Sequence, residues 1–110
     1  MRIIGGGENL EAKPFMEIAI GDTKVKCFKD YDGKTVFLLS SISKVLGYGD
    51  SNKLSNLLSE ERKKKLIMDS GNGIRLSWFV DSLGLVNLII KSRKLDDKIK
   101  FDFINNYFVL

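Results

Sequence analysis

The spacing of apolar residues changes repeatedly along this chain, between every second position and every third or fourth. Alternation marks four segments: 15–20, 24–28, 35–38 and 74–80. Helical spacing holds in 42–46 and 54–58, and again from Leu83 onward. A strand buries alternate side chains and a helix every third or fourth, so the pattern predicts strands, helices, strands and helices in that order. Elements grouped in this way favour an α+β fold over a doubly wound sheet.

Turn residues separate these segments where hairpins need them. Gly21-Asp22 fits a two-residue hairpin loop and Asp30–Gly33 fits a turn, so the first three strands are predicted to form an antiparallel meander. Ser70–Gly73 predicts a glycine-rich hairpin tip between two further strands. We therefore expect small antiparallel β-sheets, a meander plus a β-hairpin, packed on about four short helices.

Capping residues mark the starts of the first two predicted helices. Ser40-Ser41 would cap the first helix, which Gly47 ends, and Asp50–Asn52 would cap the second. The short glycine turn between them outlines a pair similar to a helix-turn-helix. The apolar stripe of the second helix is predicted to be Leu54, Leu57 and Leu58.

Two longer helices are predicted in the last third of the chain. The segment from Leu83 to Lys91, capped by Asp81-Ser82, is apolar nearly all round, so we expect it to be the central buried helix. Asp96-Asp97 would open the final helix, where acidic residues complement the helix dipole. That helix carries Phe101, Ile104 and Tyr107.

Length and composition predict one intracellular domain. The 110 residues suffice for one core, which we place at residues 14–110 after a flexible N-terminal tether at 1–13. No stretch approaches the roughly 20 apolar residues that cross a bilayer, so we expect no membrane partner. The single cysteine, Cys27, suits a reducing cytoplasm and is expected to be a buried apolar residue.

Catalytic residue types are scarce in this sequence. There is no histidine, which removes the usual general base, and one cysteine alone cannot form a zinc site. The glycine clusters at 5–7 and 71–73 lack the strand-loop-helix context of a phosphate-binding loop. Paired acids at Glu60-Glu61 and Asp96-Asp97 are explained by helix capping. We expect neither enzyme activity nor a cofactor or metal.

Positive charge is clustered more tightly than the net charge of +4 suggests. Arg62–Lys65 precede a predicted strand, with Lys53 upstream and Arg75 across the hairpin. Four consecutive cations cannot all be buried, so we expect an exposed ridge that either contacts phosphates or is a solvated end of the element. Lys91–Lys94 form a second basic cluster, which either complements the helix dipole or binds nucleic acid.

Polar side chains offer two further candidate contacts. The second helix presents Asn52, Lys53 and Asn56, which either start a helix or meet bases and phosphates in a groove. The hairpin tip at Asn72 either is a plain turn or enters a groove. Tyr48 and Trp78 are expected to be core or half-buried aromatic residues.

Three segments carry a resemblance to a known family. The first is a strand and capped helix at 36–48 that ends in Leu-Gly-Tyr, and the second is the hairpin from Leu66 to Val80. The third, Gly84–Lys94, is similar to a Gly-Leu-Tyr-x-Leu-Ile-x-x-Ser-Arg-Lys run. Together they resemble the Bro N-terminal domain of phage antirepressors and baculovirus repeated proteins, over roughly Met16 to Leu110.

The resemblance implies a DNA-binding domain that acts in prophage or viral transcription regulation, with double-stranded DNA as partner. A homodimer is a separate expectation, because the apolar end at Tyr107–Leu110 would suit an oligomer or partner contact. The alternative is a protein-interaction module that binds a repressor or host factor. Two departures bear on this: Ser41 replaces a usual Asp, and Phe101–Phe103 replaces a tryptophan flanked by basic residues. The residues expected to contact DNA are Asn52, Lys53, Asn56, Arg62, Lys63, Lys64, Lys65, Asn72, Arg75, Lys91, Ser92, Arg93 and Lys94.

Overall fold

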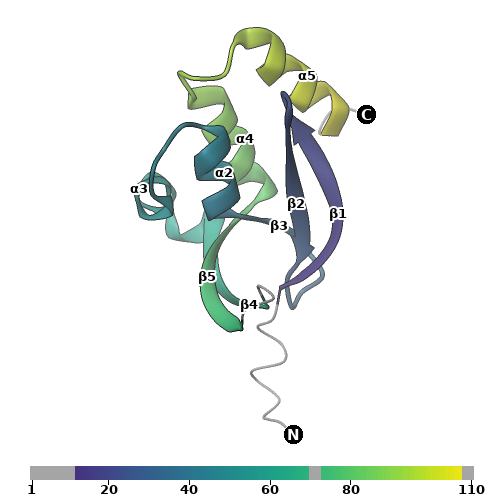
Figure 1. Ribbon diagram of the computed structural model, residues 1–110, viewed down its shortest axis with the longest axis vertical. Helices are drawn as coiled ribbons and strands as arrows, with labels where there is room; N and C mark the ends of the chain where they lie inside the picture. Colours follow the sequence, from purple (N-terminus) through teal and green to yellow (C-terminus); the bar gives the residue numbers. More distant parts are fainter. Residues whose placement is uncertain (1–11, 70–72, 108–110) are drawn as a thin grey trace, which may run out of the picture.

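The computed structural model describes residues 12–69 and 73–107 (Figure 1). Its strands are β1 (Lys13–Ile20), β2 (Thr23–Lys29), β3 (Thr35–Leu38), β4 (Lys63–Asp69) and β5 (Ile74–Asp81). Its helices are α2 (Leu39–Val45), α3 (Ser51–Ser55), α4 (Ser82–Lys91) and α5 (Asp97–Tyr107), with a short 3-10 helix, η1 (Glu60–Arg62), before β4. The predicted α+β class and the order of strands and helices are confirmed.

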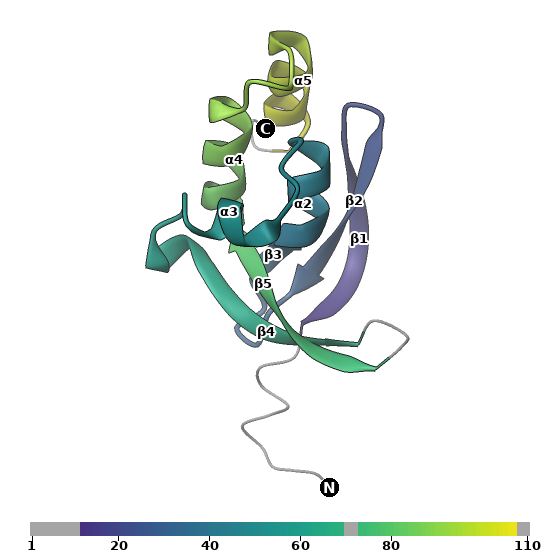
Figure 2. The same ribbon diagram turned by 60° about the vertical axis from the view of Figure 1, so that its left-hand side comes forward.

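The predicted meander and hairpin form one antiparallel sheet, in the order β1-β2-β3-β5-β4. β3 joins the two parts by pairing with the last three residues of β5, as in Phe37 opposite Val80. Alternation within each segment predicted the strands, but it carries no information on which distant strand β3 would meet. The first residues of β5 run past the end of β3, and the outer part of the hairpin extends away from the helices (Figure 2).

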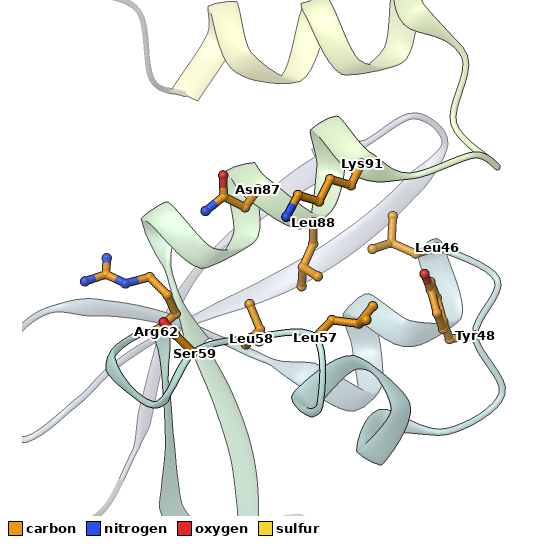
Figure 3. A pocket seen from close by; sticks show the side chains of 9 residues that line it. All are labelled: Leu46, Tyr48, Leu57, Leu58, Ser59, Arg62, Asn87, Leu88 and Lys91. Carbon is orange, nitrogen blue, oxygen red and sulfur yellow. The ribbon is translucent and has the colours of Figure 1, made fainter.

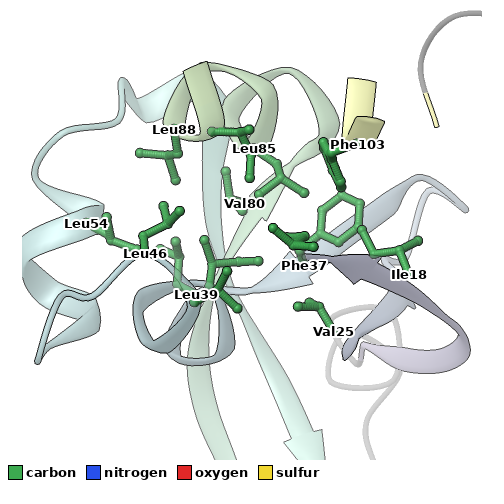
Figure 4. Close-up of a cluster of buried hydrophobic side chains, with 14 of the residues drawn as sticks. Ile18, Val25, Phe37, Leu39, Leu46, Leu54, Val80, Leu85, Leu88 and Phe103 are labelled. Carbon is green, nitrogen blue, oxygen red and sulfur yellow. The ribbon is translucent and has the colours of Figure 1, made fainter. Parts of the chain in front are cut away.

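The main core lies between the sheet and the helices. Figure 4 shows Phe37 and Val80 from the sheet facing Leu85 and Leu88 from α4, with Phe103 from α5 beside them. Phe103 is buried, so it is the residue of the Phe101–Phe103 segment that packs in the core. Cys27 is also buried in this cluster, as expected, and burial raises the pKa of its thiol, with a smaller contribution from Glu17.

A second, smaller core forms because the sheet curls on itself. The N–H of Ala12 donates to the carbonyl of Ile67 in β4 at 2.9 Å, which brings the start of β1 to the opposite edge of the sheet. The buried residues of this cluster are Ala12, Phe28, Val36, Leu66 and Phe79. β1 begins at Lys13 and Ala12 is buried, so these two residues, placed in the tether from the sequence, belong to the described fold.

The start of the first helix was predicted wrongly. α2 begins at Leu39, directly after β3, and its N-cap is Leu38 without a side-chain cap. Ser40 therefore lies in the first turn, where its carbonyl accepts the hydroxyl of Ser43. The prediction for Gly47 is confirmed, because its φ of 80° ends the helix and lets the N–H of Tyr48 donate to the carbonyl of Ser43.

Asp50 caps α3 as predicted, its carboxylate accepting the N–H of Asn52 at 2.8 Å. The predicted stripe is only partly correct, since Leu54 and Leu58 are buried and Leu57 is 58% exposed. The helix ends at Ser55, so residues beyond it no longer follow helical spacing.

Asp81 caps α4 as predicted, and its carboxylate accepts the N–H of Gly84. The helix is not buried all round, because Leu83 is 64% exposed and Ile90 also faces solvent. Only one side of α4 packs on the sheet. The prediction of a central buried helix is therefore wrong, although apolar residues lie nearly all round α4. In α5, the carboxylate of Asp96 accepts the N–H of Ile99, and Phe101 is exposed.

Gly84 offers a test of the packing between α4 and β5. A Cβ at this position would lie 2.5 Å from Cγ2 of Val80 and 3.1 Å from Cβ of Arg62. Val80 is fully buried and cannot turn away, so overpacking of roughly 1–3 kcal/mol should exceed the helix propensity that alanine adds. We expect Gly84→Ala to lower the free energy of unfolding in urea by about 1–2 kcal/mol. Gly49→Ala, which meets nothing within 4 Å, should change it by less than about 0.5 kcal/mol; equal effects would contradict this account.

Candidate nucleic-acid interface

The structure separates the four consecutive cations at Arg62–Lys65. Lys63–Lys65 lie within β4, so alternate side chains point to opposite faces of the sheet. Arg62 lies in η1 and forms an ion pair with Asp81 at 3.0 Å. The prediction of one exposed ridge before a strand is therefore wrong, and each cation has a different environment.

Lys63 and Lys64 are engaged within the fold. The Lys63 side chain is only 9% exposed, and its Nζ donates to the carbonyl of Ser55 at 2.7 Å. The Lys64 Nζ lies on the other face, 2.7 Å from Oδ2 of Asp30 and 4.7 Å from the ring centroid of Tyr31. These two lysines connect β4 to α3 and to the β2–β3 turn. Their ammonium groups are therefore largely occupied and are poorly placed to bind a phosphate.

The Asp30 carboxylate is the fully buried member of that pair. Its Oδ1 accepts the N–H groups of Asp32 and Lys34, and its Oδ2 accepts from Lys64. Burial acts to raise the pKa of Asp30, but the hydrogen bonds from Lys64, Lys34 and Asp32 outweigh it, so the pKa is lowered. The pKa of Lys64 is raised, because its hydrogen bond and attraction to Asp30 outweigh desolvation.

Lys65, Arg75 and Asn52 come together around one open concavity of about 330 Å³. We call it the hairpin–α3 concavity; its lining is Leu38, Ser40, Ser51, Asn52, Lys65, Met68, Arg75, Leu76, Ser77 and Trp78. None of these residues is acidic. Among the side chains that the structure describes, neither Lys65 nor Arg75 has an acidic partner within salt-bridge distance.

Three local features build this concavity. β5 extends beyond β3, which leaves the β3 side of residues 74–78 open. Asp50 caps α3 and holds Asn52 in its first turn above this opening. Lys65 stands opposite Trp78 in the hairpin register, with its Nζ 5.0 Å from the ring centroid, so the aromatic ring supports the cation.

Sequence reasoning missed that Trp78 and Ser77 line this site, since Trp78 was expected only to be core or half-buried. It is half-buried, and it also borders the concavity. Counting the hairpin register outward from Ser70–Gly73 would have placed Trp78 opposite Lys65. Lys53 on α3 and Asn56 directly after it are exposed but lie outside the lining, and Asn72 lies outside the described residues.

The second basic cluster forms a different surface. Ser92 was predicted to contact DNA. It is buried instead, and its Oγ accepts the N–H groups of Lys94 and Leu95, so it does not face a phosphate. Lys91, Arg93 and Lys94 are exposed. They line an open concavity of about 420 Å³ together with Leu46, Gly47 and Tyr48. The Lys94 stem packs over Gly47, where a Cβ would lie 2.9 Å from its Cδ.

A third concavity of about 300 Å³ adjoins the second (Figure 3). It shares Leu46, Tyr48 and Lys91 with its neighbour and adds Leu57, Leu58, Ser59, Arg62, Asn87 and Leu88. It shares no lining residue with the hairpin–α3 concavity. Of the cations predicted to contact DNA, Lys65 and Arg75 therefore line one surface, and Arg62, Lys91, Arg93 and Lys94 line another.

The described residues contain no group of three or more His, Cys, Asp or Glu side chains placed to hold a metal ion. No helix in the described part of the chain is long and apolar enough to cross a membrane.

Comparison with known proteins identifies the class of this fold. The family model described as the BRO family, N-terminal domain, matches residues 24–108. The match spans most of the chain, from β2 through α5, and the chain therefore belongs to the BRO family as an N-terminal domain. No curated protein and no solved structure matched the chain.

The Asp30–Lys64 pair predicts a pH-dependent stability. Because the pKa of Asp30 is lower in the folded than in the unfolded chain, its carboxylate stabilises the fold above its ordinary value of 3.8. That contribution is lost as the pH falls through the lower folded pKa. Asp30→Asn should lower the free energy of unfolding by about 1–3 kcal/mol at pH 7, and the deficit should shrink below about pH 4 in urea titrations.

Asp32→Asn is the matched control for this measurement, since Asp32 is an exposed acid in the same turn. It should change stability by less than about 0.5 kcal/mol. A deficit in Asp30→Asn that stays constant from neutral to acidic pH would show that the carboxylate charge does not stabilise the fold.

Proposed function

We propose that this domain binds double-stranded DNA through the hairpin–α3 concavity. The observation that carries the proposal is the convergence of Asn52, Lys65 and Arg75, from three elements, on one open surface without an acidic residue. Cations of this kind meet phosphates and release counterions, and an asparagine amide pairs with an adenine edge. Lys65 and Arg75 position the duplex, and Asn52 supplies sequence preference.

The shape of the interface supports the same proposal. α3 has five residues, so on its own it is too short to fill a groove. The β4–β5 hairpin projects beside it (Figure 2), and two-stranded ribbons of this kind enter a groove in other DNA-binding proteins. Lys53, which is exposed on α3, extends the polar surface toward the phosphate backbone.

Family membership supports a regulatory role and not a catalytic one. Membership in the BRO family is consistent with a DNA-binding domain of the antirepressor type. In this role the domain acts inside a bacterial or host cell, where it occupies a DNA site or competes for it and so changes transcription. The proposal needs no cofactor, because positioning and charge alone account for binding.

The phosphate contacts can be measured by salt titration of binding to a labelled duplex, followed by fluorescence anisotropy. Replacing Lys65 and Arg75 together with alanine should weaken binding and lower the slope of log K against log salt concentration by about two. The Lys24→Ala, Lys26→Ala double variant is the control, because both lysines are exposed on β2 and the charge change is the same.

The control should reduce affinity only slightly and leave the salt slope within about one of the wild type. Equal losses in the two double variants would mean that binding follows net charge and not the concavity. Absence of duplex binding by the wild type at low salt would refute the proposed function.

Asn52 offers a separate test of sequence preference. If its amide contacts a base, Asn52→Ala should reduce discrimination among duplexes by about 1–3 kcal/mol while the salt slope stays unchanged. Binding to a randomised duplex pool, followed by sequencing, measures this preference. Asn56→Ala, an exposed asparagine outside the lining, is the matched control, and an unchanged preference in Asn52→Ala would remove Asn52 from base contact.

A further inference from the structure

The surface between α2, α3 and α4 has a chemical character unlike that of the hairpin–α3 concavity. Its floor is apolar and is formed by Leu46, Leu58 and Leu88, which are buried. Leu57 stands at the wall with 58% of its surface exposed, and Tyr48 lies at the far end. Figure 3 shows Leu88 pointing from α4 toward Leu57 and Leu58 across the opening. We call this surface the α4 groove.

Positive charge lies at one end of the α4 groove. Beyond Tyr48 the groove continues into the concavity lined by Lys91, Arg93 and Lys94, and Leu46, Tyr48 and Lys91 border both parts. Neither part is lined by an acidic residue. At the opposite end, Arg62 is already paired with Asp81 at 3.0 Å. The groove therefore runs from a chamber with an apolar floor and a polar border, where Arg62 is neutralised by Asp81, to a cationic end.

We propose that the α4 groove binds an acidic protein segment that carries a large apolar side chain. The apolar chamber, at about 300 Å³, has room for such a side chain, and its exposed leucine loses unfavourable contact with water when covered. Carboxylates that follow the anchor reach the three cations at the other end, which have no acidic partner among the described side chains. Charge complementarity thus sets the orientation of the segment.

A protein segment fits this surface better than a nucleic acid does. Phosphates and sugars gain nothing from a floor of leucines, and interfaces with DNA are more polar than this one. An apolar anchor beside a charged rim is instead the usual composition of a peptide-binding groove. The α4 groove and the hairpin–α3 concavity share no lining residue, so DNA and the segment would contact different side chains.

The test uses a random-peptide display library selected on the immobilised wild-type domain. Peptides that bind should be enriched in Asp and Glu next to a large apolar residue. Bound to the isotope-labelled domain, a selected peptide should shift the NMR signals of Leu57, Leu88 and Lys91. Leu57→Ser and Lys91→Glu should each weaken its binding by about tenfold or more.

Matched controls distinguish binding in the groove from non-specific hydrophobic binding and from an effect of net charge. Leu83→Ser removes an equally exposed leucine from the same helix as Leu88, and Lys24→Glu reverses an exposed lysine on β2. Both should leave peptide affinity within about twofold of the wild type, well under the 1.4 kcal/mol that a tenfold change represents. Circular dichroism of each variant confirms that it is folded.

Three outcomes would overturn the proposal. Selection could recover no peptide, or peptides without acidic enrichment. Binding could be insensitive to Leu57→Ser and Lys91→Glu. Duplex DNA could shift the same groove signals and lose as much affinity in Lys91→Glu as in the Lys65, Arg75 double variant, which would make the groove a second nucleic-acid surface while leaving the proposed DNA function standing.

Discussion

The pairing of β3 with β5 is the contact on which the rest of this structure depends. It joins the N-terminal meander to the β4–β5 hairpin and makes one sheet of two locally folded parts. Each partner strand leads directly into a helix, since β3 is followed by α2 and β5 by α4. The pairing therefore also sets α2 beside α4 on one face of the sheet, where they close the main core (Figures 1 and 4).

The same pairing creates the candidate interface because it is short. β3 meets only the last three residues of β5, so residues 74–78 of β5 have no paired strand on the β3 side. That open stretch, together with the capped first turn of α3, forms the hairpin–α3 concavity. On the other side of α3, the residues after the helix and those of α4 form the α4 groove. One short helix thus separates a polar cationic surface from an apolar one.

Strand geometry explains why the cations of β4, which are consecutive in the sequence, do not form one exposed surface. In β4 the side chains of Lys63 and Lys65 point to one face and that of Lys64 to the other. Lys63 meets the carbonyl of Ser55 and Lys64 meets the Asp30 carboxylate, so only Lys65 remains largely exposed. A cationic run that appears to be a binding ridge therefore serves mainly to hold the hairpin to its neighbours.

Local rules determined much of this protein from the sequence alone. Alternation, helical spacing and turn residues predicted the α+β class, the turns at Gly21-Asp22 and Asp30–Gly33, the caps at Asp50 and Asp81 and the helix end at Gly47. These features depend on residues within a few positions of one another. Tertiary structure alone decided the rest: the pairing of β3 with β5, the exposure of Leu57 and Leu83, and the partners of Lys63 and Lys64. These depend on contacts between residues far apart in the chain, which local periodicity does not encode.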